Sequence, residues 1–374
     1  MVDALLVTSS FLPGRGGIES YLAELCKQIA PRLAVLAPGE REGRKLPDDL
    51  GYPTIAGPGS MLVPGSRVTK AIAKAAAQLE VDRVVFGTPW PLVLTGPKLK
   101  QQGIRYSVIV HGSELLVPSA IPVLRRKLAR ALADADVLFP VSEFTAGAIR
   151  KALTKHGLTA PPLERLGARV DTNRFHPDIE GELRERFDLG SEDKVIVHLG
   201  RLVQRKGVHR LIEAIDEIAQ RIDRRVVLLV GGTGPQESRL QIEAARRNTT
   251  VIMAGRISDE DSPSFYSLGD VFVLPVADRY WGLDTEGLGV VLLEAQACGV
   301  PCITGRSGGT VEAVRHGTTG FLIDATDRTE LVEKVDYLLQ NDEEARRMGA
   351  AGRDFVVKTH SHDLSPKPLL DWLE

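Results

Sequence analysis

The sequence predicts an α/β fold with two doubly wound, Rossmann-like domains. Short and nearly continuous apolar runs, which are typical of strands buried in a parallel sheet, alternate with segments of helical periodicity. This alternation begins at the N-terminus and begins again after residue 175. The chain has 374 residues, which also suggests two or three domains of about 150 residues each.

The elements of the first half begin in the order strand, loop, helix. We expect a strand over Ala4–Thr8 and a helix that begins near Ile18, with the loop 11–17 between them. Further strands are expected at 33–36, 83–86, 106–110 and 137–141, with helices at 68–80 and 121–133. Such alternation is typical of an open sheet.

The second half repeats this order. Its expected strands cover residues 195–199, 226–230, 250–254, 271–274 and 301–304. Residues 176–194 are polar and begin with His176-Pro177, which is typical of a connection between domains. The two domains are therefore expected to join near residues 168–175.

Composition excludes several classes of protein. Apolar residues make up 43% of the chain, and no apolar run approaches the roughly 18 residues of a membrane span. The N-terminus lacks the basic region of a signal peptide. Cys26, Cys298 and Cys302 have no metal-binding spacing, and their odd number argues against a disulfide framework. We therefore expect a cytoplasmic protein with reduced thiols.

Charge is unevenly distributed along a chain whose net charge is −2. Residues 1–168 carry 21 Lys and Arg against 14 Asp and Glu, a net charge of +7, and the remainder carries −9. The first half is therefore expected to face an anionic partner. Its helix at 122–132 is basic and amphipathic and is expected to rest on anionic lipid, unless it only presents solvated charge. The basic residues are Arg125, Arg126, Lys127 and Arg130.

One stretch, residues 283–299, indicates a binding site. Glu286 lies in a glycine-containing loop, and Glu294 follows eight residues later in an apolar helix, roughly 12 Å away if the whole span is helical. Free backbone N–H groups near Leu288 and Gly289 favour an anion between the two carboxylates. A sugar nucleotide, with hydroxyls on both sides of a diphosphate, has this shape. The alternative is a helix with one buried, hydrogen-bonded glutamate.

Two loops of the first half also follow strands. Gly16 and Gly17 lie between a strand and a helix, where missing side chains let backbone N–H groups approach a phosphate. An ordinary tight turn is the alternative. His111 lies at the strand edge where open α/β sheets bind ligands, and it is either a ligand contact or a structural hydrogen-bonding residue.

The loop Gly200–Gly207 follows a strand of the second half and precedes a helix. Arg201 offers a planar set of donors to phosphate and Lys206 a movable charge, so both could converge on one diphosphate. A solvated basic turn is the alternative. Gly232 closes the next strand and is expected to line a nucleotide pocket through its backbone.

The stretch from Glu286 to Pro301, with seven residues between its two glutamates, resembles the donor-site signature of family 4 retaining glycosyltransferases. Within this family, residues 283–289 are similar to the bacterial phosphatidyl-myo-inositol mannosyltransferases. The resemblance extends over most of the chain, including Arg15–Tyr21. It implies the GT-B fold, in which two domains face each other across a cleft. The first would be 1–168, to which 358–374 crosses back, and the second 169–357.

The resemblance implies a role for each matched residue. Gly16 and Gly17 meet the donor diphosphate, and His111 contacts the transferred sugar. Arg201 and Lys206 neutralise the departing diphosphate in place of a metal ion, so no metal or other cofactor is expected. Glu286 holds sugar hydroxyls and Glu294 the ribose, and the donor site also includes Gly232, Arg256, Ile257, Gly287, Leu288 and Gly289. The relatives' second histidine is replaced by Ser113, which leaves the acceptor open.

The predicted enzyme is a retaining, metal-independent hexosyltransferase that transfers mannose from GDP-mannose to a phosphatidylinositol-type lipid. It is expected to be cytoplasmic and peripheral on the inner face of the cell membrane. Its expected partners are the sugar nucleotide, the lipid acceptor and an anionic membrane surface, without nucleic acid. One alternative is a UDP-sugar-dependent glycosyltransferase with a small-molecule or other lipid acceptor. A nucleotide-sugar 2-epimerase is a further alternative, which the pairs Arg201/Lys206 and Glu286/Glu294 disfavour.

Overall fold

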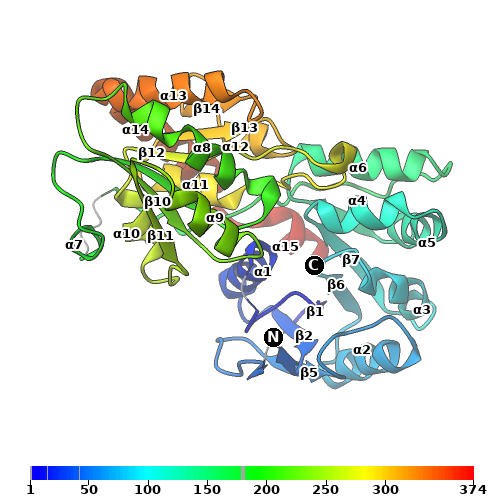
Figure 1. Ribbon diagram of the computed structural model, residues 1–374. Helices are drawn as coiled ribbons and strands as arrows, with labels where there is room; N and C mark the ends of the chain where they lie inside the picture. The colour runs from blue at the N-terminus through cyan, green and yellow to red at the C-terminus, as the bar shows by residue number, and fades with distance from the viewer. Residues whose placement is uncertain (1, 15, 42, 178–181) are drawn as a thin grey trace. The chain divides into compact units, whose positions relative to one another are not determined.

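The computed structural model describes residues 2–14, 16–41, 43–177 and 182–374. The chain divides into two units, Met1–Arg169 with Ser365–Glu374, and Val170–Leu364. Each unit is built around one six-stranded sheet (Figure 1). The division differs from the predicted boundaries at residue 169 and at residues 358–364. The second difference arises because helix α14 continues to His360 within the second unit.

The first unit has a parallel sheet with the strand order β5-β2-β1-β6-β7-β8. These strands are β1 (Ala4–Val7), β2 (Leu33–Pro38), β5 (Thr54–Gly57), β6 (Arg83–Phe86), β7 (Arg105–Val110) and β8 (Val137–Pro140). A short antiparallel pair, β3 (Glu40–Arg41) and β4 (Arg44–Lys45), follows β2. The helices are α1 (Gly17–Gln28), α2 (Ser66–Gln78), η1 (Leu92–Thr95), α3 (Gly96–Lys100), α4 (Ser113–Ala120), α5 (Pro122–Ala133), α6 (Glu143–Thr154) and α15 (Lys367–Leu373).

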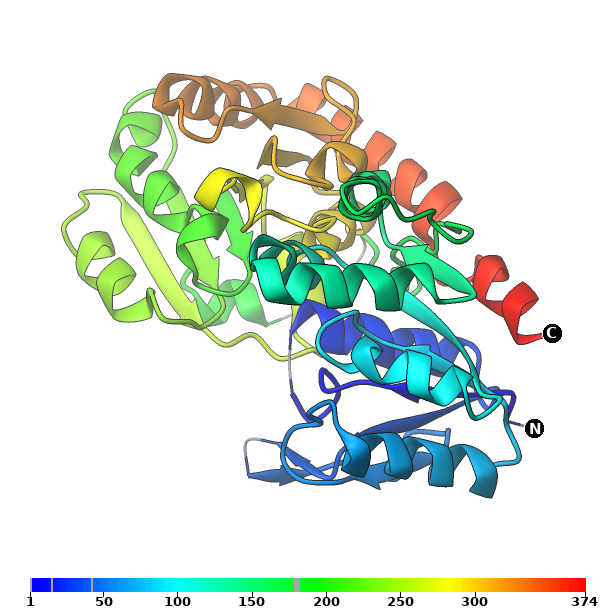
Figure 2. The same cartoon turned by 90° about the vertical axis from the view of Figure 1, so that its right-hand side faces the viewer.

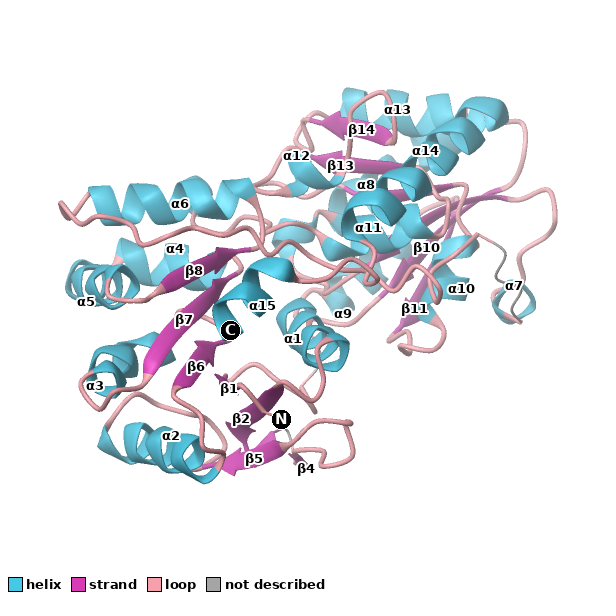
Figure 3. Cartoon of the chain, turned by 180° about the vertical axis from the view of Figure 1, so that it is seen from behind, coloured by secondary structure: helices cyan, strands magenta, loops and turns pink. Residues whose placement is uncertain are grey.

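Alternate strand residues of the first unit face two separate cores. Leu5 and Val7 belong to the core under α2, α3, α5 and α6, whereas Ala4 and Leu6 belong to the core under α1 and α15. Figure 3 shows α1 and α15 on one side of the sheet and α2 and α3 on the other. Because both faces are covered, the strands are apolar at nearly every position, as the sequence predicted.

Both ends of the chain lie in the first unit, near the same end of its sheet (Figure 2). The last helix, α15, has only seven residues, but Leu369 and Leu373 are buried against the sheet. Arg83 Nη1 donates a 2.9 Å hydrogen bond to Leu373 O. The C-terminal segment is therefore an integral part of the first unit.

The second unit has a parallel sheet with the order β11-β10-β9-β12-β13-β14. Its strands are β9 (Lys194–Leu199), β10 (Val226–Gly231), β11 (Thr250–Gly255), β12 (Val271–Leu274), β13 (Cys302–Gly305) and β14 (Gly320–Ile323). Its helices are α7 (Leu183–Arg186), η2 (Gln204–Lys206), α8 (Val208–Ala219), α9 (Glu237–Ala244), α10 (Ser262–Ser267), η3 (Tyr280–Gly282), α11 (Val290–Ala297), α12 (Thr310–Ala313), α13 (Arg328–Gln340) and α14 (Asp342–His360). Helices α8 and α13 pack on one face of this sheet.

Each predicted strand is present, but the edge strands β5 and β14 were not predicted. β5 is only partly buried and therefore has no continuous apolar run, and β14 has four residues that begin with glycine. Helix α5 begins at Pro122 rather than at Ile121, which is extended because a residue before proline avoids the helical region. Among the described residues, no helix has both the length and the apolar character to cross a bilayer.

Candidate functional site

Glu286 lies at the centre of a cluster of charges in the second unit. Lys206 Nζ donates to Glu286 Oε2 at 2.7 Å, and the guanidinium of Arg205 donates to the same oxygen. Arg205 Nε also donates to Asp284 Oδ1 at 2.9 Å. The cations come from η2 and the carboxylates from the loop before α11, so the fold joins residues 80 positions apart.

This cluster keeps Glu286 ionised. Burial by itself would raise the pKa of Glu286, but the charges of Lys206 and Arg205 and their hydrogen bonds lower it to about 2. The side chain is only 13% exposed, so little solvent screens these interactions. An ionised carboxylate can accept hydrogen bonds from sugar hydroxyls, but it has no proton to give as a general acid.

Glu294 lies within α11, as predicted, in a different electrostatic environment. Burial raises the pKa of Glu294, while a 2.6 Å hydrogen bond from Tyr266 Oη and the charge of Arg174 oppose that rise. The span between the glutamates is not helical throughout, because α11 begins only at Val290, after Gly289 at φ 84°. The predicted spacing for a continuous helix therefore does not apply, and a loop joins Glu286 to the helix.

A second loop, Ser307–Thr310, holds the backbone around Glu286. The N–H of Glu286 donates to Ser307 Oγ at 3.2 Å, and the N–H of Gly309 donates to Glu286 O at 2.9 Å. A Cβ on Gly308 would lie 2.0 Å from Glu286 O, and one on Gly309 would lie 2.1 Å from Gly287 O. Only glycine therefore permits this close approach of the two loops.

The other predicted donor-site residues follow strands of the same sheet. Arg201 follows β9 and is exposed, and among the described residues its guanidinium has no ion-pair partner. Gly232 follows β10 at φ 120°, and a Cβ there would lie 1.9 Å from Gly200 O. Its N–H donates to Gly255 O, so a contact with a nucleotide would use other atoms of this loop. Arg256 and Ile257 follow β11.

His198 is a buried imidazole near Lys206 that the sequence did not single out. The distance between His198 Nδ1 and Val273 O is 2.9 Å. Within the described part of the chain, His198 Nε2 has no hydrogen-bond partner. Burial lowers the pKa of His198 to about 4, and the charge of Lys206 adds to this effect while the bond to Val273 opposes it. His198 is therefore neutral near pH 7, with Nδ1 as the donor.

His111, in the first unit, directly follows β7 and is 9% exposed. Its Nε2 lies 3.0 Å from Gly87 O, so the tautomer that donates from Nε2 leaves Nδ1 as an acceptor. Burial lowers the pKa of His111, although the charge of Glu114 opposes this. A neutral His111 can therefore accept a hydrogen bond from a hydroxyl group.

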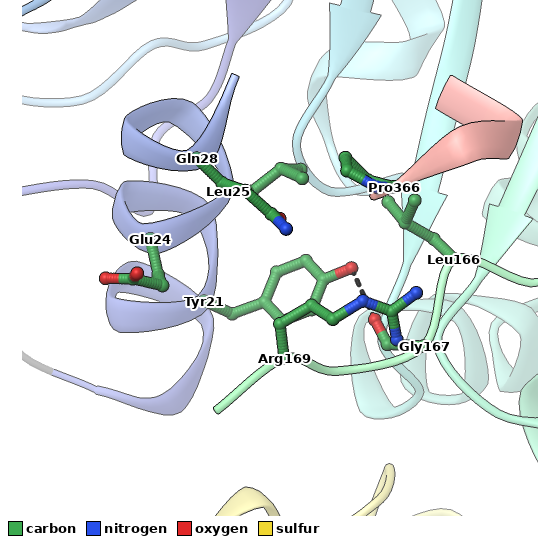
Figure 4. A pocket seen from close by; sticks show the side chains of 8 residues that line it. All are labelled: Tyr21, Glu24, Leu25, Gln28, Leu166, Gly167, Arg169 and Pro366. Atoms are coloured by element: carbon green, nitrogen blue, oxygen red, sulfur yellow. Dashed lines mark hydrogen bonds between the residues drawn. The ribbon is translucent and has the colours of Figure 1, made fainter. Parts of the chain in front are cut away.

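Tyr21 supports His111 and lines a small pocket of the first unit. The two rings meet edge-on, with 5.0 Å between their centroids. Figure 4 shows the Tyr21 ring reaching from α1 towards Gly167 and Arg169, and its hydroxyl donates to Gly167 O at 2.7 Å. Burial raises the pKa of Tyr21, against the charge of Arg169, so its hydroxyl stays protonated. Tyr21 thus fixes α1 to the segment 166–169, beside His111.

The predicted glycines of the first unit begin α1, after β1. Gly16 is the N-cap and Gly17 the first helical residue, and a Cβ on Gly17 would meet nothing within 4 Å. Arg15 and the side chain of Ser113 lie outside the described residues. Gly16, Gly17 and His111 therefore belong to the first unit, whereas the other predicted site residues belong to the second. No group of three His, Cys, Asp or Glu residues in the described ranges could hold a metal ion.

Comparison with known proteins gives the family. The model of "Glycosyl transferases group 1" matches residues 180–355. The "GDP-mannose-dependent alpha-(1-6)-phosphatidylinositol monomannoside mannosyltransferase" of Mycolicibacterium smegmatis is 38% identical over 94% of this chain and 93% of its own length. The chain belongs to this family of glycosyltransferases. A similar glycosyltransferase of Corynebacterium glutamicum, named for a monoacylated phosphatidylinositol monomannoside, is 35% identical over 99% of this chain and 97% of its own.

The glycosyltransferase also resembles solved structures over its whole length. HepE of Anabaena in complex with UDP has a TM-score of 0.82 at 19% identity, covering 100% of this chain and 99% of that chain. Sucrose-phosphate synthase from Thermosynechococcus elongatus has a TM-score of 0.78 at 19% identity, covering 99% and 98%. The predicted fold class, two Rossmann-like domains of the GT-B type, is confirmed.

Two residues of the glycosyltransferase site, Arg205 and Tyr266, were missed in the sequence, and the stretch that begins at Ser307 was interpreted as either structural or close to the sugar. Arg205 pairs with both Glu286 and Asp284, and its position directly before Lys206 was the available signal. Tyr266 and Ser307 contact the two glutamates through hydroxyl groups, from distant parts of the chain. No local pattern links these hydroxyls to the glutamates.

Proposed function

We propose that this glycosyltransferase transfers mannose from GDP-mannose to a phosphatidylinositol-type lipid that already carries one mannose. The full-length similarity to mannosyltransferases named for this donor and acceptor carries the proposal. The charge cluster around Glu286 supports it, because a buried carboxylate beside two cations suits a ligand with both hydroxyls and phosphates.

In this proposal the second unit binds the donor. Glu286 accepts hydrogen bonds from mannose hydroxyls, and Lys206, which already touches Glu286, reaches the neighbouring diphosphate. Exposed Arg201 supplies a second cation to the phosphates. The N–H groups at the start of α11, around Leu288 and Gly289, favour the same anion. Glu294 accepts from the ribose hydroxyls, and Tyr266 orients it.

We further propose that the reaction retains the anomeric configuration. The bond between the anomeric carbon and the diphosphate oxygen breaks, and the acceptor oxygen bonds to that carbon on the same face. The leaving diphosphate takes the proton of the acceptor hydroxyl. Lys206 and Arg201 stabilise the negative charge that develops on the diphosphate. His111 accepts a hydrogen bond from the transferred sugar. NMR of the product anomer tests this step, and an inverted product would reject it.

We expect catalysis to require no metal ion. The positive field at the diphosphate would come from Lys206, Arg201 and the N-terminus of α11. Activity should therefore persist in excess EDTA. Loss of activity with EDTA, restored by Mg²⁺ or Mn²⁺, would contradict this expectation.

We also propose that the first unit docks on an anionic membrane through α5. Arg126, Lys127 and Arg130 are exposed, whereas Arg125 is half-buried, so three basic residues can contribute about 1 kcal/mol each. Leu128 and Ala131 are buried in the core, so the apolar face that the sequence predicted is not available to lipid. The apolar side chains that lipid can reach are those of Ile121 and Val123, which are 46% and 70% exposed and lie close in sequence to the basic residues of α5.

Liposome flotation tests this docking. The parent should float with vesicles that contain phosphatidylinositol, less so as salt rises, and the triple change of Arg126, Lys127 and Arg130 to Ser should weaken flotation. A matched control changes Arg224, Arg246 and Lys358 to Ser, which removes the same charge from exposed positions of the second unit. Equal flotation of the α5 variant and the parent would reject docking through α5. Such docking would place the enzyme at the inner face of the cell membrane.

The central experiment measures which donor and acceptor the protein consumes. Radiolabelled GDP-mannose and UDP-sugars are offered separately, each with and without phosphatidylinositol monomannoside. We expect a labelled lipid only with GDP-mannose and the mannolipid together. Transfer from a UDP-sugar to a water-soluble acceptor would overturn the proposal.

A further inference from the structure

The loop Arg279–Asp284 carries two aromatic side chains outside the protein, shortly before Glu286. Trp281 is fully exposed, with a relative exposure of 101%, and Tyr280 is 59% exposed. Both residues have left-handed backbone conformations, at φ 55° and 51°, which are unfavourable for bulky residues. Exposed apolar side chains on a strained backbone mark a binding function.

The loop is nevertheless firmly held. The N–H of Arg279 donates to Asp284 O at 3.0 Å, and the N–H of Asp284 donates back to Arg279 O at 3.2 Å. The Arg279 guanidinium lies 4.6 Å from the centre of the Tyr280 ring and donates to its hydroxyl. Asp284 also accepts from Arg205, which itself binds Glu286. The aromatic tip is thus connected through hydrogen bonds to the candidate donor site.

We propose that the Tyr280–Trp281 tip inserts into the head-group layer of the membrane that holds the acceptor, and that it anchors the second unit there. This inference rests on the proposed function, because it requires an acceptor embedded in a bilayer. Trp and Tyr, each with an apolar ring and a polar edge, gather at this layer. Arg279 beside them can keep its charge in the polar part of the layer.

The position of the tip fits the geometry of a lipid acceptor. The reacting hydroxyl of such a lipid stays close to the head-group layer, which is about 5 to 8 Å thick on each side of the hydrocarbon. The donor sugar held at Glu286 must therefore come close to the membrane surface. Five residues of chain span at most about 17 Å, so Trp281 cannot lie far from Glu286. A fully exposed side chain within this distance of the donor sugar can reach the same layer.

The exposure of Trp281 favours a bilayer over a sugar ring as its partner. A ring that stacks on a sugar needs only one open face and is usually supported by protein on the other. Trp281 is open on both faces and along its edge, as its full exposure requires. Such a side chain is suited to insertion into a fluid layer, where lipid surrounds it on all sides.

Fluorescence quenching can detect the insertion of Trp281 into a membrane, and it requires no substrate. The difference in emission between the parent and Trp281→Phe isolates Trp281 from Trp90 and Trp372. Vesicles of phosphatidylcholine and phosphatidylinositol with brominated acyl chains should quench this difference emission, and the same vesicles without bromine should not. Absence of quenching would overturn the proposal. Because the measurement uses neither donor nor acceptor, it tests whether the Tyr280–Trp281 tip enters the membrane even if the proposed transfer reaction is wrong.

Steady-state kinetics then distinguish the bilayer from the acceptor sugar as the binding partner of Trp281. With vesicle-embedded phosphatidylinositol monomannoside, Trp281→Ala should raise the acceptor KM about tenfold, because a large aromatic surface no longer leaves water. The KM for GDP-mannose and for the deacylated, water-soluble acceptor should stay the same. Trp281→Phe should keep the parent's KM. A control, Ile242→Ala, removes a 57% exposed apolar side chain from α9 and should change neither acceptor KM.

An equal rise in KM for the soluble and the embedded acceptor would overturn the proposal and assign the ring to the acceptor sugar. A parent that transfers mannose to neither acceptor would instead reject the proposed function. The two failures are therefore distinguishable.

Discussion

Replacing Glu286 by glutamine should destabilise the second unit, because the change removes a charge and keeps the shape of the side chain. Lys206 then loses the carboxylate that it contacts, while Arg205 keeps Asp284. The pKa of Glu286 falls from 4.5 to about 2 in the folded protein, and one pKa unit corresponds to about 1.4 kcal/mol. We therefore expect Glu286→Gln to reduce the free energy of unfolding near pH 7 by about 3 kcal/mol.

The pH dependence of this loss has a definite sign. Because the folded protein holds the pKa of Glu286 below its unfolded value, the stabilisation is present above pH 4.5 and disappears as pH falls towards about 2. The difference between parent and variant should therefore shrink through this range, since the parent carboxylate also becomes neutral. Urea unfolding at several pH values, followed by circular dichroism, measures this difference.

A matched control and a double-mutant cycle make the test specific. Glu333→Gln removes the same charge from an exposed position of α13 and should leave stability nearly unchanged. Lys206→Met combined with Glu286→Gln should cost less than the sum of the single changes. Transfer activity of Glu286→Gln should fall at least about 100-fold. Parent-like stability, or a difference that persists in acid, would refute the electrostatic account of the site.

His198 should make the parent lose stability, by up to about 3 kcal/mol, as pH falls from 6.5 to about 4. In this range the imidazole becomes protonated in the unfolded chain, whereas the buried imidazole of the folded protein stays neutral. Urea unfolding of His198→Asn should lack this part of the slope, and an unchanged slope would contradict the assignment. Gly232→Ala should lower stability by more than about 3 kcal/mol, since its Cβ would lie 1.9 Å from Gly200 O, whereas Gly17→Ala has open space and serves as the control in thermal unfolding. Tyr266→Phe should raise the pKa of Glu294 further and move the acid limb of kcat/KM for GDP-mannose to higher pH; an unmoved limb would show that ionised Glu294 is not needed.

Local patterns in the sequence were sufficient to predict the strands and the double α/β organisation. β1, β6 and β12 are buried on both faces, so their apolar runs are visible without knowledge of their partners. β5 and β14 escaped prediction because both are short: each has four residues, including one glycine, which leaves only a brief apolar run to recognise. The motif around Glu286 was also visible, since the loop, the glycines and the helix are contiguous.

By itself the sequence determined which chemistry each loop offers: two carboxylates at 286 and 294, two cations at 201 and 206, and glycines between strands and helices. Only the tertiary structure decided how these groups are paired. Lys206 meets Glu286 directly, Arg205 joins the cluster and Arg201 remains exposed. Pairing depends on which strand ends adjoin in the sheet and on which way each loop turns. Those relations are set by packing between residues some 80 positions apart, and no local pattern of side chains encodes them.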